Sequence, residues 1–240
     1  MTLLRSASFS DIGRVRRKNE DRFLCDDDAM IFGVADGVGG LPGGAEAAEH
    51  TVREIADELH HLKPGGDADL TTIVQRVNHR IRQLGATLSP AMGIGSTLTF
   101  GVVRAGELQI AHVGDSRCYV WHRGDCQQLT EDHSVENEAR HRRARGETVF
   151  YHESNRNALT RCMGQPGSPA VDVICRPLRA GERYLFCTDG VTRLISNDEL
   201  GALLGKPLEP SELLREIILL AVHRGGPDNA TGVLVFVDEP

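Results

Sequence analysis

The sequence lacks any apolar run that approaches the roughly 18 residues of a membrane-spanning helix, so we expect no membrane span. Residues 1–10 contain no long apolar segment either, and we therefore expect no signal peptide. Basic residues are not in excess, because the formal net charge is −7. A nucleic-acid-binding protein normally carries a basic face, so we expect no nucleic-acid partner.

Paired cysteines are missing as well. The six cysteines are scattered along the chain, and none belongs to a C-x-x-C pair. Several lie in strand-like runs, where buried thiols are ordinary, so we interpret them as reduced and non-catalytic. Reduced cysteines are typical of a cytoplasmic protein, which is the location that we expect.

The sequence does contain acidic residues at the ends of strand-like apolar runs. A single Asp-Gly pair is usually a plain turn, so the hypothesis of a site rests on the joint pattern. Carboxylates that rigid strands hold at their ends can converge on one point. An oxygen ligand set without Cys or His favours Mg²⁺ or Mn²⁺. The acidic residues in question are Glu20, Asp36, Asp115, Asp189 and Asp228.

The pattern of apolar residues predicts an α+β fold, in which sheets pack together and helices cover them. Strands are expected at residues 22–25, 30–35, 171–177, 183–187 and 230–237, with a four-stranded meander over 96–129. The short connections of that meander indicate antiparallel neighbours. Helices are expected up to residue 61 and over 70–88, 132–145, 198–204 and 211–224. We find no domain boundary and expect one domain over residues 1–240.

Particular residues mark the ends of these helices. Asp69 and Ser211 are expected as N-caps, and Gly225 lies just past the last helix. Pro64-Gly65-Gly66 separates the first two helices.

Two divalent cations held by shared carboxylates can activate a water molecule between them for in-line attack on phosphorus. Asp36 suits the bridging position, because Gly37 would let its own carbonyl approach a metal without a side-chain clash. A phosphate group also needs an anchor, and arginine can grip two phosphate oxygens at once. Several basic residues precede Glu20. For Arg14, Arg17 and Lys18 we favour a solvated turn over a phosphate contact.

Seven short motifs follow one another in a characteristic order between about residues 8 and 237. Together they resemble the metal-dependent protein serine/threonine phosphatases of the 2C type, the PPM family, in its short stand-alone bacterial form. The motifs are Val15-Arg16-x-x-Asn19-Glu20-Asp21, Val34-Ala35-Asp36-Gly37-x-Gly39-Gly40, Gly95-Ser96-Thr97, His112-Val113-Gly114-Asp115-Ser116-Arg117, Thr130-x-Asp132-His133-Ser134, Thr188-Asp189-Gly190-Val191 and Asp228-Asn229-Ala230-Thr231.

The resemblance implies an αββα four-layer sandwich, with two antiparallel sheets flanked by helices and a mobile flap at about residues 135–162. It also implies hydrolysis of phosphoserine and phosphothreonine. Position by position, it implies that Asp36 bridges two Mn²⁺ or Mg²⁺ ions and that the Gly37 carbonyl binds one of them. Asp189 and Asp228 would bind the other, and Glu20 would reach it through water. Asp115 would help bind a third ion, and Arg16 would hold the phosphate.

The match has departures that concern the proton for the leaving group. Some members carry a histidine after Asp-Gly, where this chain has Val38, and bacterial members often have histidine where this chain has Leu41. A metal-bound water or His152 could protonate the leaving group instead. His112 lies within a strand and is interpreted as a hydrogen-bonded structural residue.

The resemblance also bears on partners. It implies phosphorylated protein substrates, a cognate serine/threonine kinase with its targets, and for some relatives a secretion system; we expect a monomer. The basic run at residues 140–145 is either a solvated helix face or an attraction for acidic substrates.

Two other functions compete with catalysis. The first is a non-catalytic phosphoprotein-binding or metal-sensing domain on the same fold. The second, a nucleotide-binding protein with Leu41-Pro42-Gly43-Gly44 as its phosphate loop, ranks far lower because no G-x-x-x-x-G-K-[S/T] motif exists.

Overall fold

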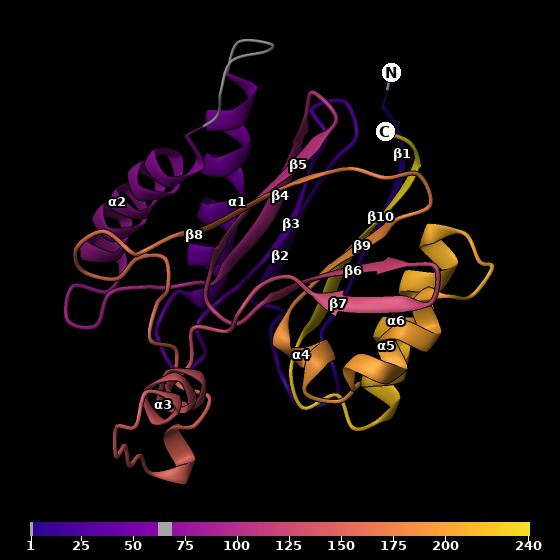
Figure 1. The fold of residues 1–240 in the computed structure, drawn as a ribbon. Helices are drawn as coiled ribbons and strands as arrows, with labels where there is room; N and C mark the ends of the chain where they lie inside the picture. The colour runs from indigo at the N-terminus through magenta and orange to yellow at the C-terminus, as the bar shows by residue number, and fades with distance from the viewer. Residues whose placement is uncertain (1, 62–68) are drawn as a thin grey trace.

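Two five-stranded antiparallel sheets pack face to face, and helices cover their outer faces (Figure 1). This computed structural model describes residues 2–61 and 69–240. The α+β fold that the residue pattern predicts, and the four-layer sandwich that the resemblance implies, are therefore confirmed. Pro64-Gly65-Gly66 lies outside the described residues.

The first sheet has the strand order β1-β10-β9-β6-β7. Its strands are β1 (Leu3–Asp11), β10 (Ala230–Glu239), β9 (Arg183–Cys187), β6 (Arg117–His122) and β7 (Asp125–Gln128). The second sheet has the order β2-β3-β4-β5-β8. Its strands are β2 (Asp21–Asp26), β3 (Ile31–Asp36), β4 (Leu98–Arg104), β5 (Glu107–Val113) and β8 (Asp172–Pro177).

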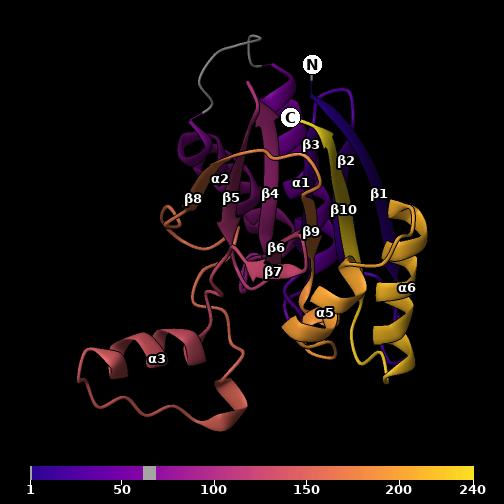
Figure 2. The ribbon, with the colours of Figure 1, turned by 45° about the vertical axis from the view of Figure 1, so that its right-hand side comes forward.

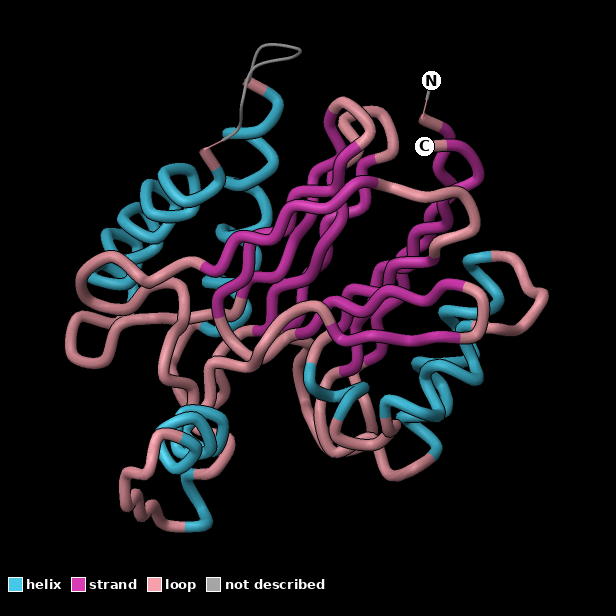
Figure 3. Tube along the Cα trace, viewed as in Figure 1, coloured by secondary structure: helices cyan, strands magenta, loops and turns pink. Residues whose placement is uncertain are grey.

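The helices form the outer layers of the sandwich (Figure 3). The second sheet is covered by α1 (Gly44–His60) and α2 (Leu70–Leu88). The first sheet is covered by α4 (Asp189–Thr192), α5 (Asn197–Leu204) and α6 (Pro210–His223). The remaining helices are α3 (Val135–Ala144) and the short 3₁₀ helix η1 (Glu153–Asn155).

Strand β10 shows how the layers are held together. Val233 and Val235 are buried in the core between the two sheets, whereas Leu234 and Phe236 are buried against the helices of the first sheet. Successive strand side chains point to opposite faces, so a strand with helices on one side and a sheet on the other is apolar throughout. This explains the unbroken apolar run near the end of the sequence.

Strand β1 is an element that the sequence analysis missed. Its residues pair with β10 in antiparallel register from Leu3↔Glu239 to Asp11↔Ala230, so the two ends of the chain lie side by side (Figure 1). The strand contains several serines and is only partly buried along its length. An edge strand of this kind gives a weak apolar signal, because one side of its backbone has no neighbour to pack against.

The connection between β5 and β6 corrects the predicted meander. All four strands of the meander exist, but β5 pairs with β4 and β8, whereas β6 pairs with β7 and β9 in the other sheet. The short Gly114-Asp115-Ser116 link therefore passes from one sheet to the other. Its length did not require the two strands to be neighbours.

The helix ends agree only in part with the sequence analysis. Asp69 caps α2 as predicted, with its carboxylate accepting a hydrogen bond from the Thr72 amide at 3.0 Å. Ser211 is not the N-cap of α6, because the helix begins one residue earlier at Pro210, which takes its favoured first-turn position. In the described part of the chain, no helix has the length and apolar character needed to cross a membrane.

Residues 134–159, called here the projecting segment, extend away from the two sheets and carry α3 and η1 (Figure 2). The segment closes at its base through a β-bridge between Ser134 and Leu159. It covers most of the stretch that the sequence analysis describes as a flap.

Candidate active site

The five acidic residues that the sequence singles out line one cleft of about 390 Å³. They come from both sheets: Asp36 ends β3, Asp189 begins α4 one residue after the end of β9, and Asp115 lies in the link between β5 and β6. Glu20 and Asp228 lie just before β2 and β10. Strands of both sheets therefore end at this cleft and bring the five carboxylates together.

Asp36 is held by two hydrogen bonds with Thr97, the residue just before the neighbouring strand β4. Its amide donates to the Thr97 hydroxyl at 2.9 Å, and the Thr97 amide donates to the Asp36 carbonyl at 2.8 Å. The next residue must be glycine for a reason that the sequence did not reveal. A Cβ on Gly37 would lie 2.5 Å from the backbone of Gly44, at the start of α1. The glycine lets the first turn of α1 pack directly against the end of β3.

Close packing also joins the start of α4, which carries Asp189, to the segment before β10, which carries Asp228. A Cβ on Gly190 would lie only 1.9 Å from the carbonyl oxygen of Asn229, so a side chain at this position would push the two segments apart. Asp189 and Asp228 immediately precede these two residues. Gly190 therefore lets the start of α4 approach the segment before β10, and the Asp-Gly pair begins a helix and does not form a turn.

Asn229 fixes the loop that carries Glu20, a role that the sequence analysis did not assign. Its side-chain amide donates to the carbonyl oxygens of Ile12 and Lys18 at 2.9 and 3.0 Å. Its side-chain oxygen accepts from the Glu20 amide at 2.8 Å. These three bonds hold the loop from β1 to β2 against the start of β10.

Arg16 lies on that same loop and lines the cleft. Its Nη2 donates to Asp228 Oδ2 at 2.7 Å, and a Cβ on Gly39 would lie 3.4 Å from its guanidinium nitrogens. Arg14, Arg17 and Lys18 are exposed and are not among the residues that line the cleft. The solvated-turn interpretation of these three residues fits this arrangement.

The carboxylates shift one another's proton affinity. Burial, together with the charges of Asp21, Asp189, Asp115 and Asp228, raises the pKa of Asp36 well above its ordinary value. Burial and the charge of Asp189 raise the pKa of Asp115 to about 7. Burial also raises the pKa of Asp189, although Arg193 opposes that shift. Without a cation, the cleft therefore tends to hold protons.

The carboxylates fit divalent cations in their charge and chemistry, although their oxygen atoms do not surround a common point in this structure. Among the described residues, no group of three or more Asp, Glu, His or Cys side chains has metal-binding spacing. Five carboxylates nevertheless face only two guanidinium groups among the described residues that line the cleft. The Oδ1 atom of Asp189 is buried and has no hydrogen-bond partner. Unpaired buried carboxylate oxygens in excess are what a hard cation requires.

Two further residues of the site were not assigned from the sequence. Asp21 is buried beside Glu20 and accepts a hydrogen bond from the Thr188 hydroxyl at 2.9 Å; burial raises its pKa to about 7. Arg193 forms an ion pair with Asp189 and lies 3.8 Å from Asp228 Oδ2. The four-residue spacing from Asp189 to Arg193 on a helix was the signal that could have revealed this pair.

The histidines divide between the core and the surface. His112 is buried; its Nδ1 lies 2.8 Å from the Thr99 hydroxyl and its Nε2 lies 2.9 Å from the Glu131 carbonyl, which confirms its structural role. His152 is exposed and caps η1, and it is not a lining residue of the cleft. Val38 does line the cleft. The described part of the cleft therefore contains no imidazole.

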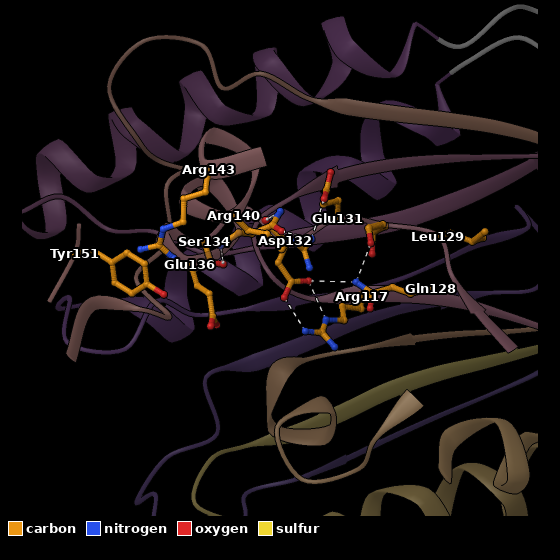
Figure 4. Close-up of a pocket in the computed structure, with 12 residues that line it drawn as sticks. Arg117, Gln128, Leu129, Glu131, Asp132, Ser134, Glu136, Arg140, Arg143 and Tyr151 are labelled. Carbon is orange, nitrogen blue, oxygen red and sulfur yellow. Dashed lines mark hydrogen bonds and ion pairs between the residues drawn. The ribbon is translucent and has the colours of Figure 1, made fainter. Parts of the chain in front are cut away.

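A larger cavity, of about 790 Å³, lies between β6, β7 and the projecting segment (Figure 4). Its charged residues have partners. Arg117 forms two hydrogen bonds with Asp132 at 2.8 and 2.7 Å, and Arg140 pairs with Glu131 at 3.2 Å. Arg143 donates to the Val149 carbonyl at 2.7 Å. This cavity is roomier than the cleft but has little unsatisfied charge to attract an ion.

The basic run of α3 is compensated within the projecting segment and its base. Arg142 and Arg145 both pair with Glu147, at 2.6 and 3.2 Å, and His141 lies within hydrogen-bond distance of Glu131. Such exposed pairs are weak, but they reduce the positive potential of the helix. The arrangement favours a solvated helix face over a surface that attracts acidic substrates.

Comparison with known proteins gives a consistent result. The protein phosphatase 2C family matches residues 14–215. The serine/threonine phosphatase stp of Listeria monocytogenes is 32% identical over 237 residues, which cover 95% of this chain and 94% of that protein. The catalytic domain of the phosphatase PstP, solved with 2 manganese ions, has a TM-score of 0.84 at 31% identity and is covered completely. PppA, a regulatory component of the T6SS in Pseudomonas aeruginosa, has a TM-score of 0.83 at 28% identity, with 98% of this chain and 97% of PppA covered.

Proposed function

The chain belongs to the protein phosphatase 2C family of serine/threonine phosphatases, and on that basis we propose that the cleft hydrolyses phosphoserine and phosphothreonine with two divalent cations. The observation that carries this proposal is the excess of partly or fully buried carboxylates over arginines in the cleft. Such an excess is unfavourable unless protons or cations neutralise it. The family is metal-dependent, and the proposal assigns that dependence to these residues.

We assign the metal ligands residue by residue. Asp36 would bridge the two ions and the Gly37 carbonyl would bind one of them. Asp189 and Asp228 would bind the other, and Glu20 would reach it through water. Asp115 would contribute to a third ion. Mn²⁺ or Mg²⁺ suits this all-oxygen set, and the similar PstP domain was solved with manganese.

When bound, the two ions would lower the pKa of a water molecule and orient it for in-line attack on phosphorus. The residues of the chain hold the other reactants. Asp36 and Asp189 need to be fully ionised to bind cations, so cation binding displaces the protons that burial retains on this cluster. Arg16 would grip the phosphoryl oxygens with its planar fork. Val38 offers no proton to the leaving group, so we propose that solvent supplies it.

The proposed partners are phosphorylated proteins and a cognate serine/threonine kinase. Similarity to PppA supports a role near a secretion system. A phosphoproteomic comparison of wild-type and deletion strains would identify the substrates as sites that gain phosphate in the deletion strain. We further propose a monomeric, cytoplasmic protein, which agrees with six unpaired cysteines. Size-exclusion chromatography with light scattering would test the monomeric state.

Chelation tests the proposed reaction. The protein should lose hydrolysis of a phosphothreonine peptide after exhaustive treatment with EDTA and regain it with Mn²⁺ or Mg²⁺. Full activity after chelation would refute the two-cation mechanism. Binding of cations and phosphopeptide without turnover would instead support the competing interpretation, a non-catalytic regulatory domain on the same fold.

A further inference from the structure

Arg193 shares the carboxylates of the cleft with Arg16. It follows the short helix α4, forms an ion pair with Asp189 and approaches Asp228. Its side chain is 41% exposed, close to the 39% of Arg16. Both guanidinium groups therefore reach inward to buried acids while remaining accessible from the opening of the cleft.

The two arginines approach a single oxygen atom. Asp228 Oδ2 lies 2.7 Å from Arg16 Nη2 and 3.8 Å from Arg193 Nη1. These two nitrogens are thus at most about 6.5 Å apart, the sum of those distances, and a phosphoryl group that accepts bonds of about 2.9 Å from each can span that gap. Guanidinium groups bind phosphate and carboxylate with the same fork geometry.

Arg193 and a cation would compete for the same ligands. Asp189 and Asp228 are the residues that we assign to one metal ion, and both interact with Arg193. A divalent cation at these carboxylates would displace the guanidinium, which would then have no strong partner in the described part of the cleft. A phosphoryl group at the opening of the cleft is a suitable anion for it.

We infer that Arg193 is a second phosphate-positioning residue, which pairs with Asp189 and approaches Asp228 in the metal-free protein and exchanges these carboxylates for the substrate phosphoryl group when cations bind. This inference rests on the proposed function of the cleft. It predicts opposite effects of one substitution: Arg193→Ala should strengthen cation binding and weaken phosphate binding. A residue with a purely structural role would not separate the two.

The experiment compares Arg193→Ala with Arg80→Ala. Arg80 is a matched control, because it is 44% exposed and pairs with two acids, Glu54 and Glu58, on the outer helices. Calorimetric titration of metal-free protein with Mn²⁺ should give a dissociation constant about 3–10-fold lower for Arg193→Ala than for wild type, since an arginine no longer competes. At saturating Mn²⁺, KM for a phosphothreonine peptide and the inhibition constant of inorganic phosphate should both rise about 10-fold. Arg80→Ala should change none of these three constants.

Each other outcome has a defined meaning. Tighter Mn²⁺ binding with unchanged KM would overturn the phosphate role, and unchanged or weaker Mn²⁺ binding would overturn the exchange. Arg193→Lys keeps the charge without the fork, so it should retain wild-type Mn²⁺ affinity with an intermediate KM; this variant decides the matter if Arg193→Ala does not fold. Wild-type protein without Mn²⁺-dependent turnover would refute the proposed function itself, a result that is distinguishable from both.

Discussion

The cleft and the larger cavity beside the projecting segment both contain arginines and carboxylates. The charged groups of the cavity are paired, whereas the cleft contains an excess of carboxylates. In the larger cavity, Arg117 and Asp132 form a two-bond pair. In the cleft, a buried oxygen of Asp189 lacks a partner, and Asp36 lies among like charges. The cavity has about twice the volume of the cleft. Unsatisfied buried charge therefore identifies the candidate site, and volume does not.

The largest expected effect comes from replacing a carboxylate of the cleft. Asp36→Asn or Asp189→Asn should lower kcat at least about 100-fold while preserving the fold, because each removes a charged ligand. Steady-state kinetics and circular dichroism would measure both properties. Asp132→Asn in the larger cavity is the control: it should cost about 1–3 kcal/mol of stability and leave most of the turnover. An Asp36→Asn variant with half the wild-type rate would contradict the assignment.

Substitutions at Arg16 test whether the position of a guanidinium group in the cleft affects phosphate binding more than its positive charge does. Arg16→Ala should raise KM for a phosphothreonine peptide and lower kcat, with about a 10–100-fold loss in kcat/KM. Lysine at this position should rescue only part of the loss, because it lacks the fork. Arg17→Ala is the matched control, since Arg17 is adjacent, equally charged and exposed. Equal damage from both substitutions would indicate general electrostatics and refute the phosphate anchor.

Asp115 separates the third ion from the core pair. We expect Asp115→Asn to bind the two core Mn²⁺ ions within about 3-fold of wild-type affinity, whereas Asp189→Asn should lose one of them. Calorimetric titration of the metal-free proteins measures this difference. Equal loss of the core ions in both variants would show that Asp115 belongs to the core pair.

The protons held in the cleft predict a pH effect on the metal-free protein. Asp21 and Asp115 have a pKa of about 7 when folded, above the value of about 4 for an unfolded aspartate. The folded state then binds more protons, so stability falls as pH rises from 6.5 to 8, by about 1 kcal/mol per group. Thermal unfolding with EDTA should show a Tm about 2–5 °C lower at pH 8. Asp115→Asn should reduce this slope, and an unchanged slope would contradict the shift.

The smallest effect is expected in the projecting segment. Replacing both Arg142 and Arg145 by alanine should change KM for an acidic phosphopeptide by less than about 3-fold, because both arginines already pair with Glu147. Kinetics at low and high ionic strength would measure the effect. A large, salt-dependent rise in KM would show that the basic run attracts substrates after all.

The sequence predicted structure best where a functional or capping residue lies next to the helix or strand whose apolar pattern identifies it. The apolar stripe of α2 and its Asp69 cap could be read directly, because helix contacts lie within four residues. The acids at strand ends were found in the same way, since each lies beside its own strand. Strand β1 was missed because its pairing with β10 joins residues more than 200 positions apart. The alternation of apolar and polar residues along β1 is too weak to predict a strand.

The sequence by itself therefore determined which residues form most of the helices and strands, and which acids stand at their ends. Only the tertiary structure decided that β5 and β6 belong to different sheets, so that the link carrying Asp115 crosses to the cleft. It also decided that Arg193, and not only Arg16, faces Asp228. The physical reason is that hydrogen-bonding propensity and side-chain alternation are local, whereas sheet membership and charge pairing depend on contacts between distant segments.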